Sequence, residues 1–191
     1  MKENENVFFT PLQYLIIIGT ISTFIVVNTH YFENTILAMG GKPIFGNKYT
    51  PQQLAFIQQV TIIQSKYYTI MILLQLPFFA LAARWIYFKK KYNYAELLTL
   101  QTLVSAQTAI IGLVIILVVV FTKTNPFIVS GIMFLYMLTF HLITYMQFFR
   151  EISFKGFLKA FFSYLLGILL FMIFAMIIGM IVGMFFMNKI K

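Results

Sequence analysis

The chain has 191 residues, of which 61% are hydrophobic and only 10% are charged. Soluble globular domains carry roughly 25% charged residues, so this composition excludes a water-exposed globule of this size. Cysteine is absent, which excludes disulfides, cysteine-ligated zinc, iron–sulfur clusters and cysteine nucleophiles. The net charge is +9, but the basic residues stand at the ends of apolar runs. Basic residues at these positions set the orientation of membrane helices and contact anionic lipid headgroups. We therefore predict no nucleic-acid partner.

The first apolar run begins at Pro11, which suits the first residue of a helix, and it carries no charge through Val27. The polar segment Met1–Thr10 lacks the basic region and the cleavage site of a signal peptide, so we expect this run to be retained as a membrane anchor. The following polar stretch contains Gly40, Gly41 and Pro43, which indicate an external loop with turns.

Thr50 and Pro51 predict the N-cap and the first residue of the next helix. The segment from Pro51 to Lys66 spaces apolar residues against glutamines, which predicts an amphipathic helix in the membrane interface. We expect it to lead straight into the second span, which Pro77 should kink by removing a backbone hydrogen bond.

The predicted fold is therefore all-α: a polytopic transmembrane helical bundle with about five spans and one interfacial amphipathic helix, forming a single domain over residues 1–191. The predicted spans cover residues 11–28, 67–88, 95–121, 127–149 and 157–187, with the external loop and amphipathic helix at 29–66.

With five spans, the basic turn Lys89–Lys91 and Arg150 fall on one face of the membrane. The positive-inside rule makes that face cytoplasmic and places the N-terminus inside the cell. We expect anionic lipid headgroups to contact the Lys89–Lys91 face.

A resemblance to a known family is carried by the middle of the chain: Leu76-Pro-Phe-Phe-Ala-Leu81, the Lys89–Lys91 run, and Tyr94-Ala-Glu-Leu-Leu98. These residues resemble a bacterial inner-membrane family of unknown function, frequent in Bacteroidetes, whose core has the form LPLFAL, basic residues, then Y-x-E-H-L-V-F-A-L-H. The resemblance implies a polytopic inner-membrane protein and brings no function. The two histidines of that core fall on Leu97 and Leu103 here, so no metal or proton role is carried over.

Arg84 and Glu96 flank the turn between the second and third spans. Because ionisable groups near the hydrocarbon need a partner, we predict an Arg84–Glu96 ion pair that closes these two helices. The alternatives are that Arg84 snorkels to headgroups while Glu96 favours the start of its helix, or that both bind a substrate.

Polar residues inside the third and fourth spans are the other candidates. Gln101, Ser105 and Thr108 share one face of a helix, which predicts interhelical hydrogen bonds, with a polar translocation path as the alternative. His141 lies near the middle of its span, where we expect a neutral, hydrogen-bonded imidazole; a proton relay or a ligand site is the alternative.

The last span carries a stripe of small residues at Ala175, Gly179 and Gly183, which would let a partner helix approach closely. Methionines also recur there, and thioethers can bind Cu(I), but in so methionine-rich a chain we expect them to fill space. We predict no metal site, no cofactor and no catalytic residue.

These patterns predict a non-enzymatic integral membrane protein, a scaffold or accessory subunit acting through helix packing, as a homo-oligomer or with a membrane-protein partner. The alternative is a small transporter or permeability factor for a lipid or hydrophobic solute, which would use the kinked second span and the polar face of the third.

Overall fold

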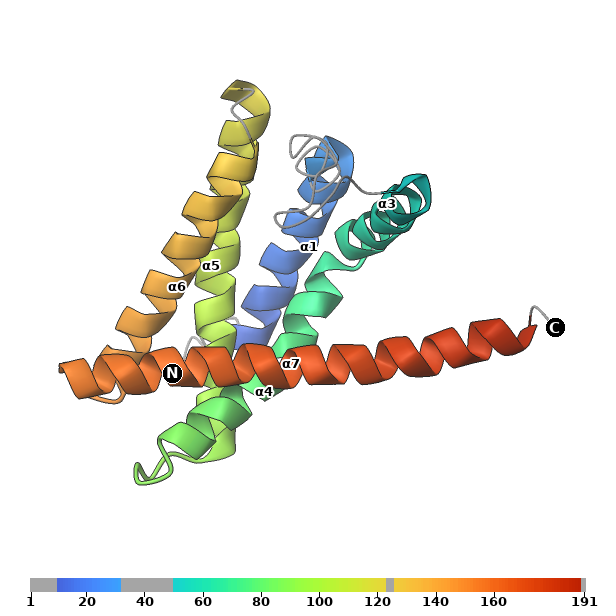
Figure 1. Ribbon diagram of the computed structural model, residues 1–191. Helices are drawn as coiled ribbons and strands as arrows, with labels where there is room; N and C mark the ends of the chain where they lie inside the picture. The colour runs from blue at the N-terminus through green and yellow to red at the C-terminus, as the bar shows by residue number, and fades with distance from the viewer. Residues whose placement is uncertain (1–9, 32–49, 123–125, 190–191) are drawn as a thin grey trace, which may run out of the picture. The chain divides into compact units, whose positions relative to one another are not determined.

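The computed structural model describes the backbone of residues 10–31, 50–122 and 126–189, and these residues form helices and no strand (Figure 1). The described helices are α1 (Pro11–Thr29), α3 (Pro51–Lys66), α4 (Tyr68–Ile86), α5 (Tyr94–Thr122), α6 (Pro126–Phe148) and α7 (Phe154–Lys189). Of these, α1, α4, α5, α6 and α7 are long and apolar enough to cross a membrane, by length and composition. The predicted all-α fold with five membrane-crossing helices is confirmed.

The helix ends agree with the predicted spans to within two residues, except that α7 begins at Phe154, three residues before the predicted start at 157. Pro77 lies inside α4, as expected. The predicted turns at Gly40, Gly41 and Pro43 lie outside the described residues.

Two helices begin with the same local chemistry, the sequence Thr-Pro-x-Gln. The Thr50 hydroxyl accepts from the Gln53 backbone N–H at 3.3 Å, and the Gln53 side chain accepts from the Thr50 N–H at 2.9 Å. Thr10 and Gln13 repeat this reciprocal pair before α1. Two of the unsatisfied N–H groups at each helix start are thereby bonded, which confirms the N-cap predicted at Thr50.

The predicted passage of α3 directly into α4 is confirmed, because Tyr67 alone separates the two helices and its N–H bonds to the Ile63 carbonyl at 3.0 Å. Most apolar side chains of α3 are exposed, including Phe56 and Ile62, whereas the small polar Thr61 and Ser65 are buried. Both hydroxyls donate to the carbonyl four residues earlier in the helix, so each has a hydrogen-bond partner. Its position in the membrane interface stays a prediction.

The described residues group into two compact units, each discontinuous in sequence. The first combines Met1–Leu73 with Thr102–Phe140, and the second combines Leu74–Gln101 with His141–Lys191. The single domain predicted over 1–191 stays a prediction.

In the first unit, α1 approaches the start of α4 closely at Gly19, where a Cβ would lie 2.7 Å from Thr69 Cγ2. One turn along α1, the Thr23 and Thr69 hydroxyls bond at 2.7 Å. Farther along the unit, Tyr31 joins an apolar core with Val26 and Ile116. Small residues and side-chain hydrogen bonds thus hold these helices together, as is usual where lipid removes the hydrophobic driving force.

Candidate functional site

The second unit contains two turns that interact: residues 87–93, which join α4 to α5, and residues 149–153, which join α6 to α7. Asn93 begins α5 with a reciprocal cap. Its N–H bonds to Glu96 Oε2 and its side-chain oxygen accepts from the Glu96 N–H, both at 2.8 Å. The predicted Arg84–Glu96 ion pair is therefore wrong, because the Glu96 carboxylate caps its own helix instead.

The end of α6 has a left-handed residue, Arg150, with φ of 52°. The Arg150 N–H bonds to the Gln147 carbonyl at 3.1 Å, and the Glu151 N–H bonds to the Met146 carbonyl at 3.0 Å. This pair of bonds is a Schellman motif, in which the left-handed position is usually glycine. The chain reverses direction there and brings Glu151 back toward the other turn.

The α4–α5 turn satisfies the last carbonyls of α6. Lys90 Nζ donates to the Phe149 carbonyl at 2.9 Å, and the Tyr92 hydroxyl donates to the Phe148 carbonyl at 3.3 Å. A helix C-terminus has carbonyls without an intrahelical partner and a partial negative charge, so an ammonium group is well suited to cap it. The basic turn therefore has a structural role at the end of α6.

Glu151 is the common partner of two lysines, Lys159 Nζ at 2.7 Å and Lys90 Nζ at 3.2 Å. The hydrogen bond from Lys159 is the largest cause that lowers the pKa of Glu151, with further lowering by Lys90, while burial acts in the opposite direction. The Lys90–Glu151–Lys159 triad was missed in the sequence analysis. The available signal was the sole carboxylate of the α6–α7 turn with Lys155 and Lys159 following at helical spacing.

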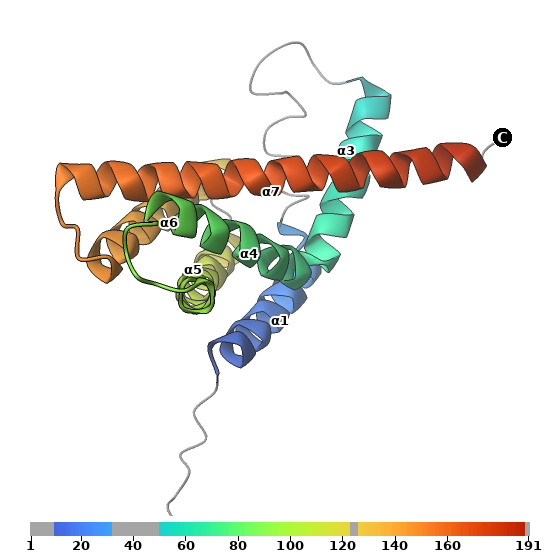
Figure 2. The same cartoon turned by 90° about the horizontal axis from the view of Figure 1, so that it is seen from below.

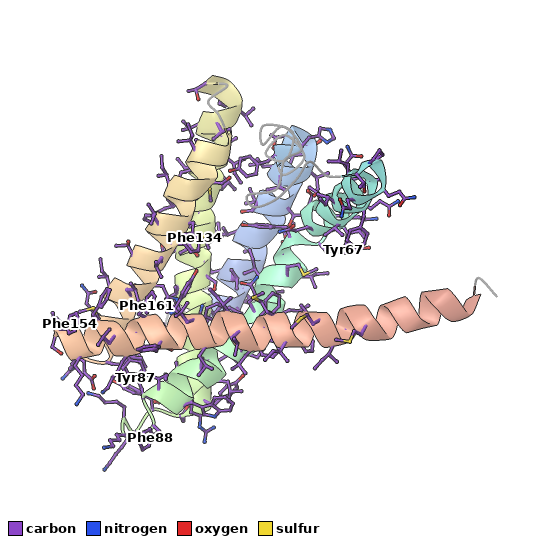
Figure 3. The ribbon with its side chains drawn as sticks, viewed as in Figure 1. Tyr67, Tyr87, Phe88, Phe134, Phe154 and Phe161 are labelled. Atoms are coloured by element: carbon purple, nitrogen blue, oxygen red, sulfur yellow. The ribbon has the colours of Figure 1, made fainter. Side chains whose placement is uncertain are left out.

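Tyr87 lies against this triad. Its ring stacks on Phe149 with centroids 3.6 Å apart and an interplanar angle of 9°, and Lys159 Nζ lies 5.7 Å from its centroid. Figure 3 labels Tyr87 and the neighbouring Phe88 at the end of α4. Tyr87 is only 3% exposed, and its hydroxyl is buried without a hydrogen-bond partner among the described residues. Burial and the charge of Glu151 both raise the pKa of this phenol, so it stays a donor.

In the same unit, Tyr145 contacts both Gln101 and His141, two of the residues predicted from the sequence. The Tyr145 hydroxyl donates to Gln101 Oε1 at 2.9 Å, and the Tyr145 ring stacks on His141 with centroids 4.1 Å apart. His141 also contacts Tyr164 edge-on, and its Nε2 has no hydrogen-bond partner among the described residues. The expected hydrogen-bonded His141 is thus not confirmed at Nε2, whereas the expected interhelical bond of Gln101 is.

The face of α5 predicted from Gln101, Ser105 and Thr108 does point inward: Gln101 and Thr108 are buried and Ser105 is half-buried. Thr108 bonds to the carbonyls of Val104 and Ser105, each at 3.0 Å. Gln101 and Ser105 lie four residues apart on this inward face of α5.

Replacing Tyr145 with phenylalanine is expected to lower the free energy of unfolding by about 1 kcal/mol, because Gln101 Oε1 loses its buried donor. Unfolding of the purified protein in mixed micelles would measure this change. In a Gln101→Leu background the same substitution should cost much less. An equal cost in both backgrounds would contradict the assigned bond.

A cavity of about 320 Å³ opens beside Tyr87, and its lining includes Arg84, Trp85, Tyr87, Lys90, Tyr92 and Phe149. The first unit has a larger cavity of about 450 Å³ between α1 and the α3–α4 junction, where Lys66 is the charged lining residue. The smaller cavity has two cationic side chains and the orphaned phenol, so it is the better candidate for recognising a polar ligand.

Among the described residues, no group of three or more His, Cys, Asp or Glu is placed to hold a metal ion. No family model, curated protein or solved structure matches the chain. The resemblance of residues 76–98 to the bacterial inner-membrane family stays a prediction. Five apolar helices of spanning length nevertheless identify a multi-pass membrane protein.

Proposed function

We propose that this chain is a non-enzymatic scaffold or accessory subunit of a membrane assembly, and that α7 is the helix that binds the partner. The proposal is supported by the different surroundings of small residues along α7. We further propose that the protein resides in a bacterial inner membrane with its N-terminus in the cytoplasm. The basic α4–α5 and α6–α7 turns would then lie on the cytoplasmic face, in accordance with the positive-inside rule.

Small residues in the first part of α7 pack tightly within the second unit. Ala160 is fully buried, and a Cβ at Gly167 would lie 2.7 Å from Phe79 Cδ1. Farther along, Phe171 and Phe174 contact Phe78, with ring centroids 5.9 and 5.0 Å apart. In this part of α7, a residue without a bulky side chain marks a place where a neighbouring helix comes close.

The later part of α7 also has small residues, but no helix packs closely against them within the second unit. This observation carries the proposal. Ala175 and Gly179 are exposed, and no described atom lies within 4 Å of a Cβ built at Gly179. Both views in Figures 1 and 2 draw α7 as one uninterrupted helix, so the two stretches belong to a single rigid element. Gly183 continues the stripe but lies outside the residues whose surroundings the structure describes.

Close backbone approach is the main source of affinity between helices in lipid, where exposed leucine or isoleucine gains little by leaving the acyl chains. An open small-residue stripe on a spanning helix is therefore a favourable surface for a second helix. The transport alternative has weaker support, because Gln101 Oε1 already accepts from Tyr145.

Substituting Gly179 with leucine should disrupt the assembly without unfolding the chain, because no described atom of the second unit lies within 4 Å of a Cβ built there. Native mass spectrometry of protein extracted gently from its own membrane would measure this. We expect the wild type to carry a stoichiometric partner, or a second copy, that the variant loses by tenfold or more, on the order of 1.4 kcal/mol.

Gly131→Leu is the matched control, since Gly131 is exposed on α6 and also has no atom within 4 Å of a built Cβ. It adds the same side chain to another apolar helix and should leave the assembly intact. A monomeric wild type, or a Gly179→Leu variant with an unchanged assembly, would overturn the proposed function.

A further inference from the structure

The cavity beside Tyr87 combines features that neither the helix packing nor the ion triad explains. It lies entirely within the second unit, at the end of α4 and next to the basic turn. Most of its lining residues are aromatic, and the polar side chains among them all carry donors: Arg84, Trp85, Tyr87, Lys90 and Tyr92. Its described lining residues include no acidic side chain.

The Tyr87 hydroxyl is the first indication of a ligand. A buried hydroxyl without a partner destabilises the fold, so native proteins seldom retain one without a reason. Phenylalanine would provide the same stacking on Phe149 without that cost. The hydroxyl belongs to a residue that lines the cavity, and its raised pKa keeps the proton available for donation.

Arg84 is the second indication. It lies in the last turn of α4 and makes no ion pair or side-chain hydrogen bond with the described residues. Lys90, in contrast, is paired with Glu151, and Glu151 is shared with Lys159. Arg84 is exposed, so its guanidinium is accessible to a ligand, and its planar fork suits two oxygens of one anion.

We propose that this cavity binds a phosphate group, carried by the headgroup of an anionic membrane lipid. Arg84 supplies the charge and a pair of N–H donors, and Tyr87 supplies the buried donor. Lys90 adds positive potential while it stays bonded to the Phe149 carbonyl. This site does not depend on α7 binding a partner, so it can be tested independently of the proposed function.

The position of the cavity favours a lipid as the source of the phosphate. Arg84 and Trp85 end an apolar helix of spanning length, and Trp85 and Phe88 are 53% and 73% exposed. Exposed aromatic residues at the end of a span are typical of the headgroup layer. The basic turn alongside adds the general attraction for anionic lipids that a cationic membrane face provides.

The test is lipid binding by the full-length protein, measured by native mass spectrometry in detergent with phosphatidylglycerol and phosphatidylcholine added in equal amounts. We expect one phosphatidylglycerol to bind in preference to phosphatidylcholine. Arg84→Gln should weaken its binding by about tenfold, because a charge-assisted hydrogen-bond pair is lost. Lys155→Gln removes the same charge from an exposed position outside the cavity and should change binding less than about twofold.

Tyr87→Phe separates a role in binding from a role in folding. If the hydroxyl donates to the ligand, this variant should bind phosphatidylglycerol several-fold more weakly while the ligand-free protein is equally or more stable. A variant that binds as well as the wild type would contradict the assigned donor. Thermal unfolding in lipid-free detergent is the accompanying measurement.

A final arm identifies the source of the phosphate. Inorganic phosphate at millimolar concentration should fail to displace the lipid; displacement would assign the same site to a soluble phosphate ligand instead. Equal losses in Arg84→Gln and Lys155→Gln would overturn the site, because the binding would then be unselective attraction by the basic face. Equal binding of the two lipids would overturn it as well, because no preference for an anionic headgroup would remain.

Discussion

Alanine at position 156 is expected to lower the free energy of unfolding by about 3 kcal/mol, the largest effect of any single methyl group in the described residues. A Cβ on Gly156 would overlap the backbone carbonyl of Glu151. That carbonyl also accepts from the Ser153 N–H at 3.0 Å, and the Ser153 hydroxyl accepts from the Gly156 N–H at 3.2 Å. The obstacle is therefore fixed backbone, which cannot rotate away as a flexible side chain would.

Unfolding of purified protein in mixed micelles would measure this loss, with Gly131→Ala as the control. Gly131 meets no atom within 4 Å of a built Cβ, so alanine there should be neutral or stabilise α6 by up to about 1 kcal/mol. If both substitutions have the same small effect, the tight α6–α7 turn described here is wrong.

Replacing Glu151 with glutamine is expected to have the second-largest effect, a loss of about 1–2 kcal/mol at neutral pH. The substitution keeps the shape of the side chain but leaves Lys90 and Lys159 without their shared counter-ion. All three side chains are partly exposed, at 34%, 33% and 19% for Lys90, Lys159 and Glu151, so water offsets part of the cost. The Lys90 bond to the end of α6 should weaken as well.

The same carboxylate predicts a pH dependence with a definite sign. Its pKa is lower in the folded protein than its ordinary value of 4.5, mainly through the hydrogen bond from Lys159. The unfolded chain therefore binds the proton first, so the stabilisation is complete above pH 4.5 and is lost as the pH falls through the folded pKa.

Unfolding free energies of the wild type and Glu151→Gln, compared from about pH 3 to pH 7, would show whether the two curves converge in acid. The other glutamates titrate in both proteins, so the difference between the curves isolates Glu151. A constant difference across the range would mean that the triad does not stabilise the fold.

The fold could be predicted from the sequence because the bilayer imposes strict rules on it. Runs of about 20 apolar residues, interrupted by Lys89–Lys91 and by Arg150, suffice to place helices. The Thr-Pro starts of α1 and α3 add local signals that do not depend on tertiary contacts. What could not be predicted is which parts of α4, α5 and α6 belong to which compact unit, since that depends on packing between distant segments.

The candidate site was harder to predict because its key contacts join two turns that are far apart in the sequence. Proximity along the chain favoured Glu96 as the partner of Arg84, but a carboxylate three residues after Asn93 has a better local use as a helix cap. Glu151 instead meets Lys90 because the Schellman motif at Arg150 turns the chain back. No periodicity in the sequence indicates that Glu151 approaches Lys90. The sequence also gives no sign that the Tyr87 hydroxyl is buried without a partner.

The α4–α5 and α6–α7 turns are joined by the Lys90–Glu151 ion pair, and we propose that both lie at one membrane face. Because the chain has no cysteine, single cysteines can be introduced one at a time and labelled in sealed vesicles with a maleimide that does not cross the membrane. Lys91→Cys and Ile152→Cys, both at exposed positions, should label from the same face, and Thr122→Cys from the opposite one. Labelling of residues 91 and 152 from opposite faces would contradict the account, because Lys90 and Glu151 could not then meet.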